Sequence, residues 1–92
     1  MPSIDDALFG DGTTLRSYRQ GLVDRFVGIG LPTDKVVEHA KAIEAYVLAG
    51  ANEDAKQARR ITIERQLGMT GDATKALAAA KTLEAYVTGK AA

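Results

Sequence analysis

The sequence predicts an all-α protein, a compact four-helix domain made of two tandem helical hairpins. Three observations favour this fold class. Apolar residues recur at spacings of three and four, which is typical of helices. Glycine, proline and capping residues interrupt that spacing at three points, as expected for turns between helices. Finally, a shift of 40 residues aligns one half of the chain with the other, and its 92 residues suffice for one small domain.

The repeat is ungapped and divides the chain into three parts. The sequence Glu-Ala-Tyr-Val occurs at 44–47 and again at 84–87, and Ala-Lys occurs at 40–41 and at 80–81. The same register aligns arginines and glycines of the two halves. We therefore expect a leader, followed by two hairpin units and a four-helix domain that spans both; the leader is 1–12, the units are 13–52 and 53–92, and the domain is 13–92.

The first unit is predicted to form two helices. Thr13 or Thr14 can cap the first helix, and glycines at its end stop it. Thr33 is expected to cap the second helix, which Gly50 closes. The apolar stripe of the first helix consists of Leu15, Tyr18, Leu22 and Phe26. The apolar seam of the second helix consists of Val36, Ala40, Ile43 and Val47.

The second unit repeats this pattern. Asn52 is expected to cap the third helix and Asp72 the fourth, with Gly71 in the turn between them. The seam of the fourth helix is predicted to be Ala76, Ala80, Leu83 and Val87. The third helix has the weakest pattern, because Ile61 and Ile63 point to well-separated faces. One of these two isoleucines should therefore contact something beyond its own hairpin.

The composition argues against enzymatic chemistry. The chain has no cysteine and a single histidine, His39, so it lacks a thiol nucleophile and the partners that a catalytic or zinc-binding histidine needs. Asp5, Asp6 and Asp11 lack the spacing of a calcium loop, and no glycine-rich phosphate loop follows a strand. We therefore expect a protein that is not an enzyme, with no catalytic residue, no cofactor and no metal.

The setting expected for such a chain is the cytoplasm. The absence of cysteine fits a reducing compartment, and the N-terminal residues show no signal peptide. No run of about 18 apolar residues is present, so we expect no membrane span. Short, alanine-rich, cysteine-free helical chains suit a bacterial or phage accessory protein.

Nucleic-acid binding is an alternative, because helix, glycine turn and helix occur twice. Its candidate residues crowd the third helix and are Lys56, Arg59, Arg60 and Arg65. The helices that would read bases, 33–49 and 72–88, contain no arginine, asparagine or glutamine for base edges. The formal net charge of zero also argues against strong phosphate binding. A dimer that pools these basic residues would favour the alternative.

The repeated Glu-Ala-Tyr-Val sequence has two interpretations. In the structural one, each tyrosine packs on its hairpin, and Glu44 or Glu84 pairs with Arg25 or Arg65 of its own unit. In the functional one, two-fold related tyrosines anchor a partner. The candidate anchors are Tyr46 and Tyr86.

Positions that differ between the two units are further candidates for function. Tyr18 aligns with Ala58 and Phe26 with Gln66, so the first helix is either more buried than the third or carries an apolar interface. The leader contains three acids, no base and interleaved apolar residues, Ile4, Leu8 and Phe9. It could form a short helix docked on the basic third helix, reach a neighbouring subunit as an arm, or fray.

Together these features predict a small non-enzymatic protein-interaction module that self-associates into a homo-oligomer through its first helix and the acidic, partly apolar leader. An adaptor, an assembly factor or an inhibitor of a larger protein would all suit such a chain. The predicted partner-binding residues are Ile4, Leu8, Phe9, Tyr18, Phe26, Tyr46 and Tyr86. DNA binding is the first alternative, and a small-ligand site between subunits is the second.

Overall fold

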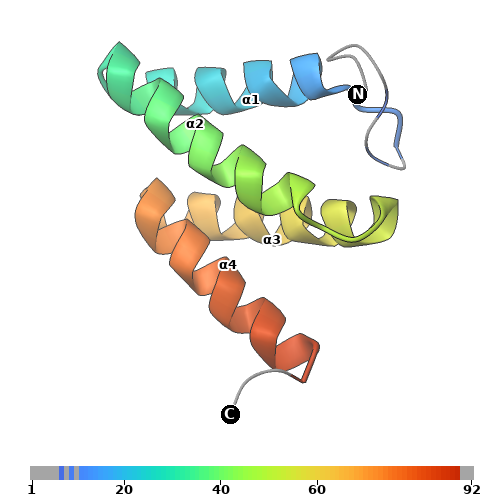
Figure 1. Cartoon of the computed structure of the whole chain (residues 1–92). Helices are drawn as coiled ribbons and strands as arrows, with labels where there is room; N and C mark the ends of the chain where they lie inside the picture. Colours follow the sequence, from blue (N-terminus) through green and yellow to red (C-terminus); the bar gives the residue numbers. More distant parts are fainter. Residues whose placement is uncertain (1–6, 8, 10, 90–92) are drawn as a thin grey trace.

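The structure, a computed structural model, confirms the all-α, four-helix class. It describes residues 7, 9 and 11–89. The helices in this part of the chain are α1 (Leu15–Gly28), α2 (Thr33–Leu48), α3 (Glu53–Thr70) and α4 (Ala73–Val87) (Figure 1). The only other regular pairing among the described residues is an isolated bridge between Ala7 and Thr14.

Three of the four helices begin at the side-chain caps that the sequence predicts. The side chains of Thr14, Asn52 and Asp72 each accept a hydrogen bond from the backbone N–H three residues later. The prediction for α2 is wrong, because Pro32 occupies the cap position and Thr33 is the first helical residue. Pro32 has the extended backbone that this position requires, and it makes no side-chain cap.

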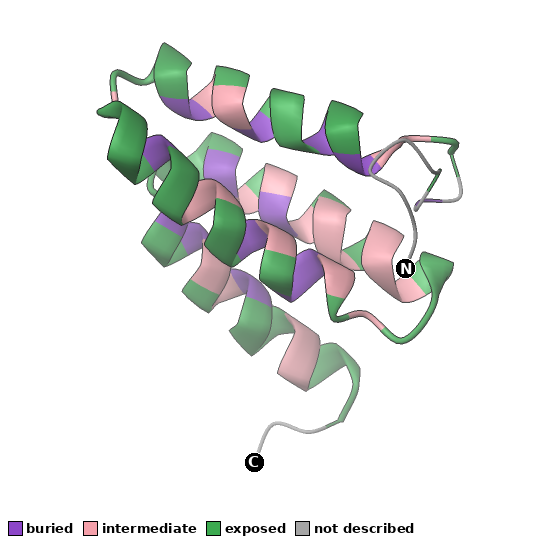
Figure 2. Cartoon of the chain, turned by 45° about the horizontal axis from the view of Figure 1, so that its top comes forward, coloured by how far each residue is buried: buried purple, intermediate pink, exposed green. Residues whose placement is uncertain are grey.

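The helices pack in sequence order, with α1 on α2, α2 on both α3 and α4, and α3 on α4. Helix α2 therefore joins the two hairpins, and the buried residues lie on the helix faces that turn toward the other helices (Figure 2). The largest fully buried side chains come from α1, α2 and α3 and are Phe26, Leu22, Ile43, Ile63 and Val47. Helix α4 contributes mainly alanines to this core.

The predicted seam of α4 is correct only over its first half. Ala76 and Ala80 are fully buried, but Leu83 is 46% exposed and Val87 is 80% exposed. The described part of the chain contains no helix after α4 that could cover these two side chains. In α3, Ile63 is fully buried against the core cluster while Ile61 is 41% exposed.

Two leader residues dock against α1 and α3. Phe9 is buried, its ring meets the ring of Tyr18 edge-on at 5.3 Å, and the guanidinium of Arg60 lies 4.8 Å from its centroid. Asp11 adds an ion pair with Arg60 at 2.8 Å. Neither Phe9 nor Asp11 is helical, while Ile4 and Leu8, which were predicted to bind a partner, lie outside the described residues.

Candidate functional site

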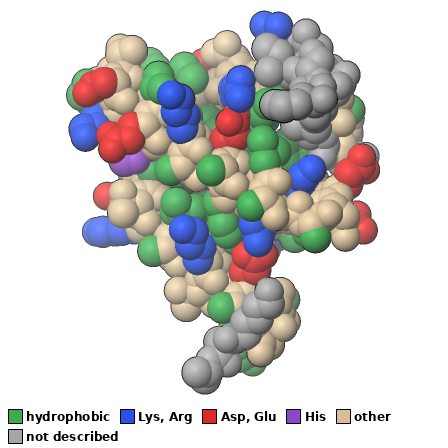
Figure 3. Space-filling view, viewed as in Figure 1, with side chains coloured by type: hydrophobic (Ala, Val, Ile, Leu, Met, Phe, Trp, Pro, Cys, Tyr) green, Lys and Arg blue, Asp and Glu red, His purple; other side chains and the backbone are tan. Residues whose placement is uncertain are grey.

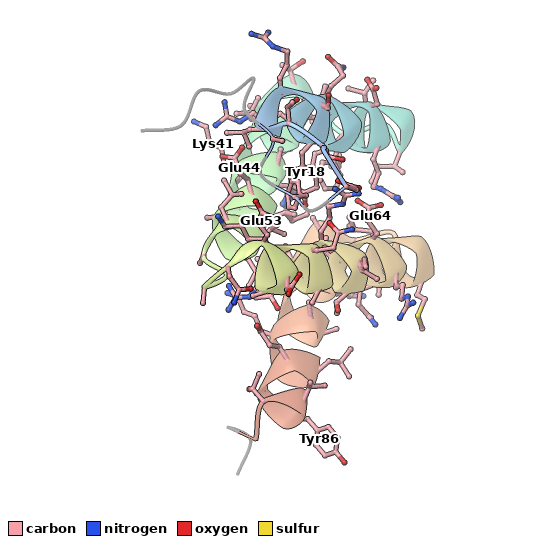
Figure 4. The ribbon with its side chains drawn as sticks, turned by 90° about the vertical axis from the view of Figure 1, so that its right-hand side faces the viewer. Tyr18, Lys41, Glu44, Glu53, Glu64 and Tyr86 are labelled. Atoms are coloured by element: carbon pink, nitrogen blue, oxygen red, sulfur yellow. The ribbon has the colours of Figure 1, made fainter. Side chains whose placement is uncertain are left out.

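The second half of α4 exposes apolar side chains at the end of the molecule. Leu83, Tyr86 and Val87, here called the α4 surface, are 46%, 79% and 80% exposed. Tyr86 points away from the body of the protein at this end of α4 (Figure 4). Contiguous exposed apolar side chains of this kind mark interaction sites more often than isolated ones do.

A groove runs beside the α4 surface, between α3 and α4. This α3–α4 groove has a volume of about 230 Å³ and is lined by Tyr46, Ala55, Ala58, Arg59, Thr62, Leu83, Glu84, Val87 and Thr88. Apart from Arg59, the residues of α3 that line it, Ala55, Ala58 and Thr62, have small side chains. The aligned positions of α1 hold Leu15, Tyr18 and Leu22, which are buried in the first hairpin. The groove thus exists because the second hairpin has small residues where the first has large ones.

The end of this groove nearest α2 is formed by three residues. The hydroxyl of Tyr46 donates to Oε2 of Glu84 at 2.8 Å, and Arg59 donates to Oε1 of Glu84, also at 2.8 Å. Arg59 also donates to the backbone carbonyl of Tyr46 at 2.6 Å, and its guanidinium lies 4.6 Å from the ring centroid. Burial, followed by the hydrogen bond to Glu84, raises the pKa of Tyr46 to about 12.

The sequence predicted the wrong arginine partners for the two repeated glutamates. Glu44 pairs with Arg19 and Glu84 with Arg59, each within its own unit. Arg25 instead reaches across from α1 to Glu64 of α3. The observed partners are themselves related by the 40-residue shift, which makes the two pairs equivalent.

Four of the predicted partner-binding residues belong to the chain's own core. Phe9, Tyr18, Phe26 and Tyr46 are between 0% and 9% exposed, so they offer no surface to a partner. This corrects the expectation for these four residues, because each is covered by another element of the same chain. Tyr86 is the one described residue of that set on the surface.

The four basic residues considered for nucleic acid do not form a common stripe. Arg59 and Arg60 are engaged with Glu84 and Asp11. Lys56 and Arg65 are nine residues apart, which places them roughly 180° apart around α3. On the face shown in Figure 3, Lys and Arg side chains are scattered among acidic ones.

An open cleft between α1 and α3 is larger than the α3–α4 groove and has a volume of about 750 Å³. The buried hydroxyl of Tyr18, which lines this cleft, makes no hydrogen bond, and burial raises the pKa of this group well above its ordinary value. The lining charges are Asp24, Arg25, Arg60 and Glu64, which cancel and therefore select neither an anion nor a cation. The described residues include no cluster of three or more His, Cys, Asp or Glu placed to hold a metal.

A further groove lies between α1 and α2, and it was not predicted from the sequence. This α1–α2 groove has a volume of about 300 Å³ and is lined by Arg19, Val23, Val37, Ala40, Lys41 and Glu44. The signal that could have found it is the repeat itself. The same shift that aligns Arg19 with Arg59 and Glu44 with Glu84 relates this groove to the place where Tyr46 packs.

None of the described helices combines the length and the apolar character that crossing a bilayer requires. Comparison of the chain with protein-family models, with curated proteins and with solved structures found no match.

Proposed function

We propose that this chain is a small, non-enzymatic protein-interaction module that binds a second copy of itself through the α4 surface. The observation that carries the proposal is a contrast between identical residues. Tyr46 and Val47 are 9% and 0% exposed, whereas Tyr86 and Val87, in the same local sequence, are 79% and 80% exposed. Full burial of a Val or Leu side chain is worth about 1.5–3 kcal/mol, so covering the α4 surface favours association.

The neighbouring α3–α4 groove supports the same proposal. Ala55, Ala58 and Thr62 leave room beside Leu83 and Val87, so a partner side chain can enter without displacing the core. Such a module could act as an adaptor, an assembly factor or an inhibitor of a larger protein. The cytoplasm remains its predicted location.

The test is the solution mass of the purified chain as a function of concentration. We expect the mass measured by light scattering to rise above 9.8 kDa for the unmodified chain. Tyr86→Glu should stay monomeric, because it places a charge in the proposed interface. The matched control is Ala78→Glu, which adds the same charge at an exposed position of α4 outside the α4 surface. Monomeric behaviour of the unmodified chain at every concentration would overturn the proposal.

Salt distinguishes this function from nucleic-acid binding. Association through apolar side chains should persist as salt is raised, whereas affinity for DNA should fall steeply. Binding of a DNA duplex that collapses in Arg59→Ala plus Arg60→Ala, without self-association, would favour the nucleic-acid alternative. A small molecule found between two copies would favour the small-ligand alternative.

A further inference from the structure

The contact between the two hairpins provides a template for a contact between two chains. Tyr46, near the end of α2, packs on the second hairpin beside Arg59, Ala80 and Glu84. Arg59 donates to the Tyr46 carbonyl, close to the C-terminal end of α2, where helix carbonyls lack intrahelical partners. The tyrosine is thus held at both its hydroxyl and its backbone.

The corresponding place on the first hairpin is the α1–α2 groove. The shift of 40 residues maps Arg59, Ala80 and Glu84 onto Arg19, Ala40 and Glu44. All three of these residues line the open groove, and Arg19 and Glu44 are already paired there, as Arg59 and Glu84 are in the second hairpin. The receiving site is therefore arranged before any partner arrives.

The same shift maps Tyr46 onto Tyr86 of the α4 surface. Tyr86 lies at the opposite end of the molecule from Glu44 and Lys41, so it cannot reach the α1–α2 groove of its own chain (Figure 4). The chain therefore exposes the inserting residue at one end and the receiving groove at the other.

We propose that copies of this chain associate head to tail, with the α4 surface of one copy in the α1–α2 groove of the next. This inference rests on the proposed function and specifies the surface that the second copy offers. The Tyr86 hydroxyl donates to Glu44 of the neighbour, and the neighbour's Arg19 donates to the Tyr86 carbonyl. Leu83 then covers Val37, whose side chain is 43% exposed in the single chain.

The same template predicts that Leu83 of one copy contacts Val37 of the next. Ile43 and Leu77 line the same pocket between α2 and α4, and the 40-residue shift maps them onto Leu83 and Val37.

A head-to-tail contact joins two different surfaces, so it leaves one α4 surface and one α1–α2 groove uncovered in every open assembly. Association then continues into a chain or closes into a ring, rather than stopping at a two-fold dimer.

The test mixes two variants, each with one broken surface. Tyr86→Glu disrupts the α4 surface, and Val37→Glu places a charge in the α1–α2 groove. Both positions are exposed, so both variants should keep the helical content of the unmodified chain. The matched control is Val27→Glu, because Val27 is an exposed valine outside both surfaces. Should Val37→Glu fail to fold, Arg19→Ala breaks the same groove at a half-exposed side chain.

We expect each variant alone to remain at the mass of one chain, and the equimolar mixture to double that mass without growing further. The Val27→Glu control should assemble like the unmodified chain. Self-association of Val37→Glu at the unmodified level would overturn the head-to-tail arrangement while leaving association through the α4 surface intact. A mixture that stays monomeric would overturn it as well. A monomeric unmodified chain would overturn both the arrangement and the proposed function.

Discussion

The hydroxyl of Tyr46 in α2 donates a hydrogen bond of 2.8 Å to the carboxylate of Glu84 in α4. Arg59 of α3 completes this contact by donating to both Glu84 and the Tyr46 carbonyl. One tyrosine thus joins three helices from two hairpins. Because the residues are partly buried, their hydrogen bonds are less exposed to competing water than those of a surface pair.

Removing the Tyr46 hydroxyl should destabilise the fold measurably. Tyr46→Phe keeps the ring in place but loses a hydrogen bond to a charged acceptor, which is worth about 1–2 kcal/mol at a partly exposed carboxylate. Tyr86→Phe is the matched control, since its side chain is 79% exposed, and it should leave the free energy of unfolding unchanged. Urea unfolding of the monomeric chain measures both. An equal loss in the two variants would contradict the structural role of Tyr46.

The two aligned valines should respond oppositely to the same substitution. Val47 is fully buried, so Val47→Asp places an unpaired charge in the core at a cost on the order of 4 kcal/mol or more. A small domain cannot absorb such a loss, and circular dichroism should show an unfolded chain. Val87 is 80% exposed, so Val87→Asp should keep the helical signal. A folded Val47→Asp variant would show that the face of α2 had been misassigned.

Local signals were sufficient to predict the four helices. Apolar spacing, glycine turns and the capping side chains Thr14, Asn52 and Asp72 all act within a few residues, so they can be recognised without tertiary contacts. The prediction failed at Pro32 and Thr33, where both residue types suit a helix start and the fixed backbone of proline decides the cap.

Burial at the candidate site could not be predicted in the same way. Tyr46 and Tyr86 share one local sequence, and their exposures differ because α2 is followed by a hairpin that covers it. The ion pairs show the same limit. The sequence pattern suggested Arg25 as the partner of Glu44, and only the packing of α1 on α2 brings Arg19 to it instead.

Acid should weaken the contact of Asp11 with Arg60 of α3. Hydrogen bonds from Thr13 and Arg60 hold the pKa of Asp11 well below its ordinary value. A depressed pKa in the folded state means that the carboxylate stabilises the fold above its unfolded pKa of about 3.9. That contribution is lost as the pH falls through the folded-state pKa.

We therefore expect the unfolding free energy of the unmodified chain to fall with pH below about 5. The decline should be shallower in Asp11→Asn, which has no carboxylate to protonate at this position. Urea titrations between neutral and acidic pH measure the two slopes. Arg60→Gln is a second variant that removes one of the two hydrogen-bonding partners, and it should also reduce the slope. Parallel slopes in all three chains would exclude the Asp11 contact as a source of the pH dependence.

Two glycines should give opposite effects when replaced by alanine. Gly21 lies within α1, and a methyl group added there would meet nothing within 4 Å. Because glycine in a helix interior is about 0.5–1 kcal/mol less favourable than alanine, Gly21→Ala should stabilise the fold by that amount. At Gly50 the added carbon would lie 2.8 Å from the backbone nitrogen of Lys56, and the backbone cannot retreat without disturbing the start of α3. Gly50→Ala should therefore lower the urea midpoint while Gly21→Ala raises it, and shifts in the same direction would contradict the close approach between Gly50 and α3.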